Sequence, residues 1–201
     1  MTKFLLIRHG DTDYVDEALA GRIDSPLNSL GSEQANKVAN AISQLPIKAI
    51  YASPLIRTQL TAAPLADILN MDVAISHGLN QVDFGRWQGL SYDDLMNDLD
   101  WQTFQKNPAI VNIPGGEDGT MVRKRVAIAI KEIVLNNHSD SIIACFSHGS
   151  IIRHIISHFI GLPIEKLNQI RIAPASISTL DIQGEDGKLL HLNQEIPVNW
   201  L

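Results

Sequence analysis

The chain has 201 residues, of which 45% are hydrophobic and 19% charged, and a formal net charge of −6. This length and composition are typical of one globular domain with a substantial core. The negative charge argues against a general nucleic-acid or acidic-membrane surface, and the apolar runs are too short to span a bilayer. No signal peptide precedes the first apolar run, so we expect a cytoplasmic protein.

The first motif is a short apolar run at residues 4–7, followed by Arg8, His9 and Gly10. Such a run indicates a buried parallel strand, and ligands bind at the carboxyl ends of these strands. Arg8 offers a charged fork for phosphate, a neutral His9 can attack phosphorus, and Gly10 permits close approach of the backbone. The tripeptide alone would occur by chance in roughly one chain in forty, so by itself it is a hypothesis.

Two later stretches repeat this design. Residues 141–149 form an apolar run that ends in His148 and Gly149, and residues 51–58 place Arg57 just after another apolar stretch. Packing does not explain two histidines and two arginines at three strand-to-helix junctions. We therefore predict that they meet in one anion site, a local positive island on a negatively charged protein.

The remaining pattern predicts a single α/β domain over residues 1–201, with a mostly parallel central sheet flanked by helices. Residues 79–119 are rich in aromatic and turn-forming residues, and we expect a lid-like insertion there that shapes specificity. An edge hairpin at the C-terminal end would permit a homodimer. We expect strands at 47–52, 72–75, 141–146, 177–182 and 188–192, and helices at 30–44, 55–70 (bent or split by Pro64), 118 or 120 to 137, and 149–160.

Together these motifs resemble the histidine phosphatase superfamily, which has the phosphoglycerate mutase-like fold, and in particular a branch of phosphatases and phosphomutases without an assigned substrate. The resemblance implies a phosphoric monoester hydrolase that acts on a small phosphorylated metabolite without a metal or other cofactor. His9 would form a phosphohistidine that water later cleaves. Arg8, Arg57 and the imidazolium of His148 would neutralise the phosphate oxygens. Further matching stretches are Phe84-Gly85 with Trp87 and Gly89, and Pro-Gly-Gly-Glu at 114–117.

The chain departs from the family at one catalytic position. The family's proton donor is the glutamate of Leu-x-Glu-x-x-Phe-Gly, and residues 79–85 here carry Gln81 instead. An amide cannot act as a general acid, although it can still bind phosphate. Val15 also replaces an asparagine that is often found six residues after the nucleophile. Three explanations compete: Asp83 or Asp11 donates the proton, the leaving group needs little protonation, or the glutamine is an engineered change.

Candidate substrate-binding residues are Gly10, Thr12, Gly21, Arg22 and Gly149, although Arg22 is equally compatible with a solvated loop arginine.

His154 and His158 have the i, i+4 spacing of a metal pair, but no Glu or Cys ligand lies near them in sequence, so we expect no metal site. Cys145 lies in an apolar strand pattern and is expected to be a buried, reduced thiol.

Two other functions are compatible with the sequence. One is a phosphoglycerate mutase-type phosphomutase, although such enzymes usually carry a longer insertion and tail. The other is a phospholigand-binding protein that has lost catalysis, which Gln81 favours and the two histidines oppose. The sequence does not name the substrate: sugar phosphates, phosphoserine, a cobalamin-precursor phosphate and nucleotides are all compatible with it.

Overall fold

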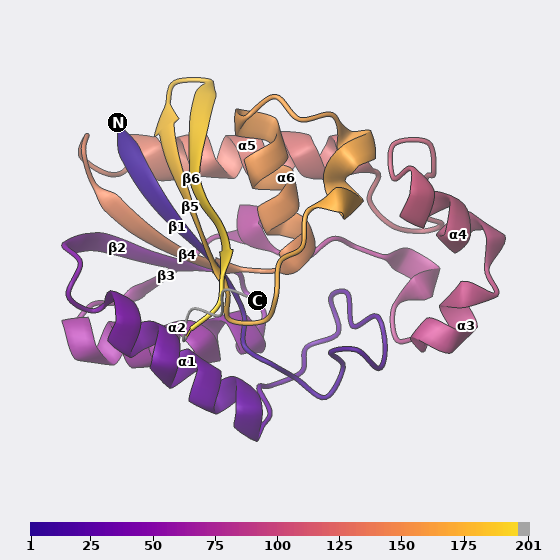
Figure 1. Ribbon diagram of the computed structural model, residues 1–201, viewed down its shortest axis with the longest axis horizontal. Coiled ribbons are helices and arrows are strands. Elements are labelled where there is room, and N and C mark those ends of the chain that lie inside the picture. Colours follow the sequence, from indigo (N-terminus) through magenta and orange to yellow (C-terminus); the bar gives the residue numbers. More distant parts are fainter. Residues whose placement is uncertain (197–201) are drawn as a thin grey trace.

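The computed structural model describes residues 1–196, so positions 197–201 of the predicted domain lie outside the described residues. A six-stranded sheet forms the centre of the molecule, in the order β3-β2-β4-β1-β5-β6 (Figure 1). The first four of these strands run parallel, and β5 and β6 are antiparallel to their neighbours. The predicted α/β domain with a mostly parallel sheet is confirmed. The strands are β1 (Thr2–Arg8), β2 (Ile47–Ala52), β3 (Val73–Ile75), β4 (Ile142–Ser147), β5 (Ile177–Gln183) and β6 (Asp186–Gln194).

Helices cover both faces of the sheet: α1 (Ser29–Ile42) and α2 (Ile56–Leu69) lie on one face, α5 (Gly119–Leu135) and α6 (Gly149–Phe159) on the other (Figure 1). Successive side chains of β1 enter the two cores in turn. Leu5 and Ile7 pack with α1 and α2, and Phe4 and Leu6 pack with α5 and α6. Because both faces are covered, the central strand is apolar at every interior position, as expected of a buried parallel strand.

The helix expected to be disturbed by Pro64 is a single helix, α2, with Pro64 in its interior. Of the two expected effects of Pro64, the split is therefore wrong and the bend stays a prediction. A proline removes only one backbone hydrogen bond, and Ala62 and Leu65 on either side of it are fully buried against the sheet. Packing of this face holds the segment helical across the missing bond.

The segment 79–119 contains three short helices, η2 (Gly85–Trp87), α3 (Tyr92–Met96) and α4 (Leu99–Lys106). The rings of Trp87 and Trp101 meet edge to face, with centroids 5.3 Å apart, and form an aromatic core for the segment. Figure 1 shows α3 and α4 to the side of the sheet, beyond the carboxyl end of β1. That the segment acts as a lid stays a prediction.

Two further short helices complete the described chain, η1 (His77–Leu79) and η3 (Ile164–Gln169). The predicted C-terminal hairpin is present, with β6 at the edge of the sheet; a homodimer through this edge stays a prediction. No helix within residues 1–196 combines the length and the apolar character that crossing a membrane requires.

Candidate active site

The two predicted histidines follow neighbouring parallel strands and therefore meet. Arg8 of β1 is paired with Ser147 of β4, and the N–H of His9 donates to the Ser147 carbonyl at 2.9 Å. His148 is the next residue along β4, so the two rings lie side by side with centroids 5.2 Å apart. Both are buried, with 5% of His9 and none of His148 exposed.

The hydrogen bond of His9 identifies its free nitrogen. Nδ1 lies 2.7 Å from the carbonyl oxygen of Gly10, which can only accept, so Nδ1 carries the hydrogen. Nε2 is left with its lone pair, which is the nucleophilic form of the ring. The N–H of Gly10 donates to Oγ1 of Thr61 at 3.0 Å and is therefore already paired. Gly10 thus orients His9 through its backbone.

Arg57 is 1% exposed and anchors the loop that follows β1. Its guanidinium donates to the carbonyl of Ile23 at 2.8 Å and to that of Gly21 at 2.7 Å. Gly21 has φ +53°, in the left-handed region that favours glycine. Burial lowers the pKa of Arg57 to about 10, so the group is still a cation at neutral pH. Gly21 therefore serves the site by holding Arg57.

Arg8 donates from Nη1 to the carbonyl of Ile172 at 2.7 Å. Its Nε is buried and has no hydrogen-bond partner among residues 1–196. The side chain runs past Gly149, the first residue of α6, where an added Cβ would lie 3.5 Å from Arg8 Cδ. The N-terminus of α6 and Arg8 therefore bring positive charge to the same place.

Burial and the two arginines keep both imidazoles neutral in the free protein. Burial, then the charges of Arg8 and Arg57, hold the pKa of His9 well below 6.5. Burial and then Arg57 lower the pKa of His148 in the same way. An imidazolium at His148 is therefore disfavoured in the free protein, first by burial and then by the charge of Arg57, and its presence beside a bound phosphate stays a prediction.

A cavity of about 300 Å³ lies against Arg8 and His9. One part of its wall is polar and the rest is apolar, with three aromatic rings from segment 79–119. His148 and Arg57 do not line it. The polar part includes Arg8, His9, Gln81, Tyr92, Glu117, Arg153 and His154, and the apolar part includes Leu19, Phe84, Trp101, Phe104, Ile113, Val122 and Leu167.

Gln81 lines this cavity, and its Oε1 accepts a hydrogen bond from the N–H of Val82 at 2.9 Å. Its NH₂ group is left as a donor. Neither of the aspartates considered as replacement acids lines the cavity. Oδ1 of Asp83 accepts from the N–H of Gly85 and Oδ2 from Arg22, and Oδ2 of Asp11 accepts from Asn28.

Glu117 is the one carboxylate among the cavity-lining residues of the described chain. Its partial burial alone would raise its pKa, but hydrogen bonds from Arg125 and the Asp83 N–H, with the charge of Arg22, lower it overall. Arg125 donates to both carboxylate oxygens, at 3.1 and 2.9 Å. Glu117 is therefore ionised at neutral pH and holds no proton to donate.

Arg22 and Thr12 lie apart from the cavity wall. Arg22 pairs with Glu117 at 3.0 Å and Asp83 at 3.3 Å, and its Nε donates to the carbonyl of Gln81. Thr12 is buried, and its Oγ1 lies 3.4 Å from the N–H of Tyr14. Arg22 thus fixes the backbone of the Gln81 segment.

His154 lines the cavity, and burial lowers its pKa to about 3. Among residues 1–196, no group of three or more His, Cys, Asp or Glu side chains is arranged to hold a metal ion. Cys145 is buried, and burial raises the pKa of its thiol, so it is an unreactive core residue.

The sequence reasoning missed the roles of Ser53 and Arg153. Ser53 is fully buried, and its Oγ lies 2.8 Å from Nε2 of His148. Arg153 lines the cavity from α6. Its position four residues after Gly149 was the available signal, because residues at i and i+4 share a helix face.

The model of the histidine phosphatase superfamily (branch 1) matches residues 4–195. The chain belongs to this superfamily. It is 32% identical to the "Probable phosphoglycerate mutase GpmB" of Enterobacter sp. (strain 638), covering 91% of this chain and 86% of that protein. It is 28% identical to phosphoserine phosphatase 1 of Hydrogenobacter thermophilus, covering 96% and 92%.

Among solved structures of this superfamily, a mutant phosphoserine phosphatase of Entamoeba histolytica in complex with phosphoserine superposes with a TM-score of 0.85. The identity is 26%, covering 96% of this chain and 97% of that one. The family resemblance seen in the motifs is thus confirmed over nearly the whole chain.

Proposed function

We propose that this protein is a metal-independent phosphatase that hydrolyses a small phosphorylated metabolite through a phosphohistidine on His9. The observation that carries the proposal is the hydrogen bond from Nδ1 of His9 to the Gly10 carbonyl. It leaves Nε2 with a free lone pair in a ring kept neutral by burial and two arginines. A neutral, oriented imidazole is what attack on phosphorus requires.

In the proposed first step, Nε2 of His9 forms a bond to phosphorus while the bond from phosphorus to the ester oxygen breaks. The leaving oxygen takes up a proton. Water then attacks the phosphohistidine, releases inorganic phosphate and restores His9. Arg8 and Arg57 supply the positive charge that metal ions supply in many phosphoryl-transfer enzymes, which supports a reaction without a metal.

The residues that line the cavity offer no evident proton donor for the leaving group. The amide of Gln81 has no proton to give, and Glu117, which also lines the cavity, is held ionised by Arg125 and Arg22. We therefore propose that the best substrates have leaving groups that depart with little protonation, or that water provides the proton.

The relatives support a small phosphorylated metabolite as the substrate class. One is named for phosphoserine and one for phosphoglycerate, and the Entamoeba structure contains phosphoserine. A cavity of about 300 Å³ is also of the size that takes a small molecule.

Two alternatives rest on specific observations. The GpmB relative favours a phosphomutase, in which the phosphohistidine would pass its phosphoryl group to a second metabolite instead of water. Gln81 favours a phospholigand-binding protein without catalysis, because it removes the usual acid.

The deciding experiment is incubation with radiolabelled aryl phosphate, followed by denaturation and measurement of acid-labile label on the protein. The chain should release inorganic phosphate and retain labelled phosphohistidine, with or without EDTA. His9→Ala should abolish both, and His138→Ala, at an exposed histidine before β4, should behave as the parent chain. Normal labelling of His9→Ala protein would refute the mechanism. Phosphate binding without any turnover would favour the binding protein.

A further inference from the structure

Arg153 is a half-buried cation of the cavity wall, and no acidic side chain among residues 1–196 forms an ion pair with it. Its Nε is buried and has no hydrogen-bond partner among these residues. By contrast, Arg22 and Arg125 both pair with Glu117. A cation removed from water without a partner is costly, so its position in a cavity points to a ligand that supplies the missing charge.

Arg153 lies close to the arginine that we assign to the phosphate. Arg8 packs against Gly149, and Arg153 is four residues further along the same face of α6. Four residues of helix correspond to about 6 Å along the axis. The charge of Arg153 also lowers the pKa of Arg8, after the effect of burial, so the two guanidinium groups repel each other.

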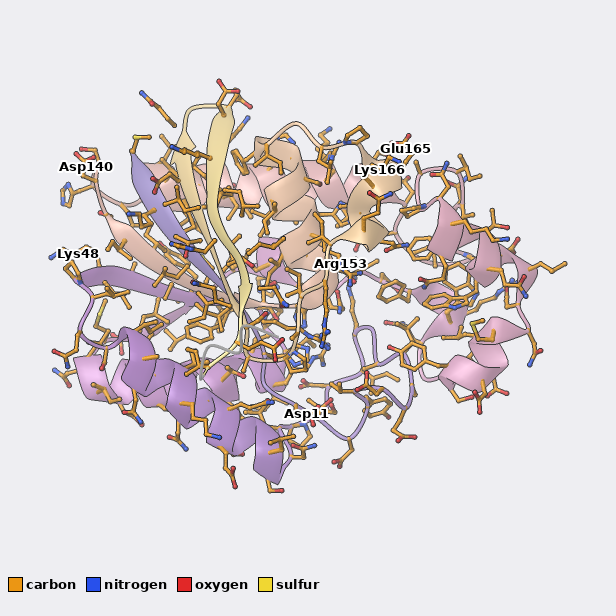
Figure 2. All side chains as sticks on the ribbon, in the orientation of Figure 1. Asp11, Lys48, Asp140, Arg153, Glu165 and Lys166 are labelled. Atoms are coloured by element: carbon orange, nitrogen blue, oxygen red, sulfur yellow. The ribbon has the colours of Figure 1, made fainter. Side chains whose placement is uncertain are left out.

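The neighbouring groups do not remove this positive charge. Burial raises the pKa of Tyr92, which lines the same cavity, so its phenol is neutral at pH 7. Glu117 is occupied by two other arginines. Figure 2 shows Arg153 beside α6, on the side that faces α3 and α4. Two guanidinium groups, those of Arg8 and Arg153, therefore line the cavity, and neither has an ion-pair partner among residues 1–196, although the charges of Asp16 and Asp11 act on Arg8.

We propose that Arg153 binds a second acidic group of the substrate, so that the preferred substrates are phosphomonoesters with a carboxylate or second phosphate a few bonds from the ester phosphorus. This rests on the proposed function, in which Arg8 and His9 hold the ester phosphate. The guanidinium fork suits both kinds of oxyanion. The Tyr92 hydroxyl offers an additional hydrogen bond to the same group.

The test measures how well matched pairs of phosphomonoesters, one with and one without a second acidic group, competitively inhibit hydrolysis of p-nitrophenyl phosphate. 3-Phosphoglycerate and glycerol 3-phosphate differ only in a carboxylate against a hydroxymethyl group. Propanediol bisphosphate and propanediol monophosphate differ in a second phosphate. We expect the diacid of at least one pair to have a Ki about 10-fold lower than its partner, as a charge-assisted bidentate contact predicts, and the preferred pair identifies the second group.

Arg153→Gln should bring that ratio close to one, and Arg153→Lys should retain part of it because the charge remains. Lys48→Gln removes the same charge from an exposed residue far from Arg153 (Figure 2) and should leave the ratio unchanged. Thermal melts establish that each variant is folded. Ratios near one in the parent chain, or an unchanged ratio in Arg153→Gln, would overturn the proposal.

Failure of the proposed function gives a different result. If the parent chain does not hydrolyse the aryl phosphate, the same pairs are compared by calorimetric titration. A preference for the diacid that depends on Arg153 would then support the second acidic-group site and refute the proposed phosphatase activity. Hydrolysis of the aryl phosphate without a preference for the diacid would refute only the proposal that Arg153 binds a second acidic group.

Discussion

The hydroxyl oxygen of Ser53 lies 2.8 Å from Nε2 of His148, and this contact occupies one of the two ring nitrogens. The other nitrogen, Nδ1, is buried and has no partner within residues 1–196. Ser53 Oγ also lies 3.0 Å from Oγ1 of Thr58 and accepts from the N–H of Leu55, so a network of hydrogen bonds holds the hydroxyl against the ring. We expect Nδ1, the ring nitrogen without a partner, to be the one that contacts a phosphate oxygen.

Ser53→Ala should lower kcat/KM for aryl phosphates about 10-fold, the loss of roughly one hydrogen bond. The ring of His148 would lose the hydrogen-bond partner that fixes its orientation. Steady-state kinetics measure the effect. Ser141→Ala is the matched control, because Ser141 is a buried serine at the opposite end of β4 whose hydroxyl donates to the His138 carbonyl. Unchanged kinetics in folded Ser53→Ala protein would contradict this role.

Arg57→Lys should raise the Ki for inorganic phosphate about 10-fold although the charge is kept. A lysine cannot hold the carbonyls of Ile23 and Gly21 and also present a planar fork to phosphate. Competitive inhibition of aryl phosphate hydrolysis measures this. Arg86→Lys is the control, since Arg86 is exposed and pairs with Asp98 and Asp100. Equal Ki values for parent and Arg57→Lys would show that the fork is not used.

Gln81→Glu should raise turnover of alkyl phosphates far more than that of aryl phosphates. General acid catalysis is typically worth about 10²–10⁴-fold, and an aryl leaving group departs with little help from an acid. The ratio of the two kcat values measures the effect. Gln105→Glu adds the same charge at another residue of the cavity wall and should not change the ratio. Equal alkyl rates in parent and Gln81→Glu would mean that the proton does not come from position 81.

The free energy of unfolding should fall as the pH drops from 7 to 5. Burial lowers the pKa of His154 to about 3, so the native ring stays neutral while the unfolded chain takes up a proton below about pH 6.5. The unfolded state then binds more protons, and each such histidine contributes a slope of up to about 1.4 kcal/mol per pH unit. His9 and His148 act in the same direction.

Urea denaturation at pH 7 and pH 5 measures this dependence, and His154→Gln should make it shallower. His191→Asn, at an exposed histidine, is the control substitution. The same slope in His154→Gln as in the parent chain would show that His154 is not kept neutral in the native state.

The sequence by itself determined the class of fold and the edge of the sheet that carries the site. Short apolar runs that alternate with helical patterns specify parallel strands, and the carboxyl ends of such strands lie at one edge. The local pattern is sufficient to place the site, because its residues stand at the ends of strands: Arg8 ends β1, His9 follows it, and His148 follows β4. The Gln81 substitution was also readable without coordinates. A split of the helix at Pro64 was wrong because packing, which lies outside the local pattern, keeps α2 continuous.

Only the tertiary structure decided how these residues act. The strand order β2-β4-β1 depends on pairing between distant segments, and it places His148 between His9 and Ser53. The free nitrogen of His9 follows from one hydrogen bond, to Gly10. The neutral state of each imidazole follows from burial beside Arg57. Arg153 has no ion-pair partner among residues 1–196 because the fold places the carboxylates elsewhere. These properties depend on distances between residues remote in the chain, which residue types and their spacing do not contain.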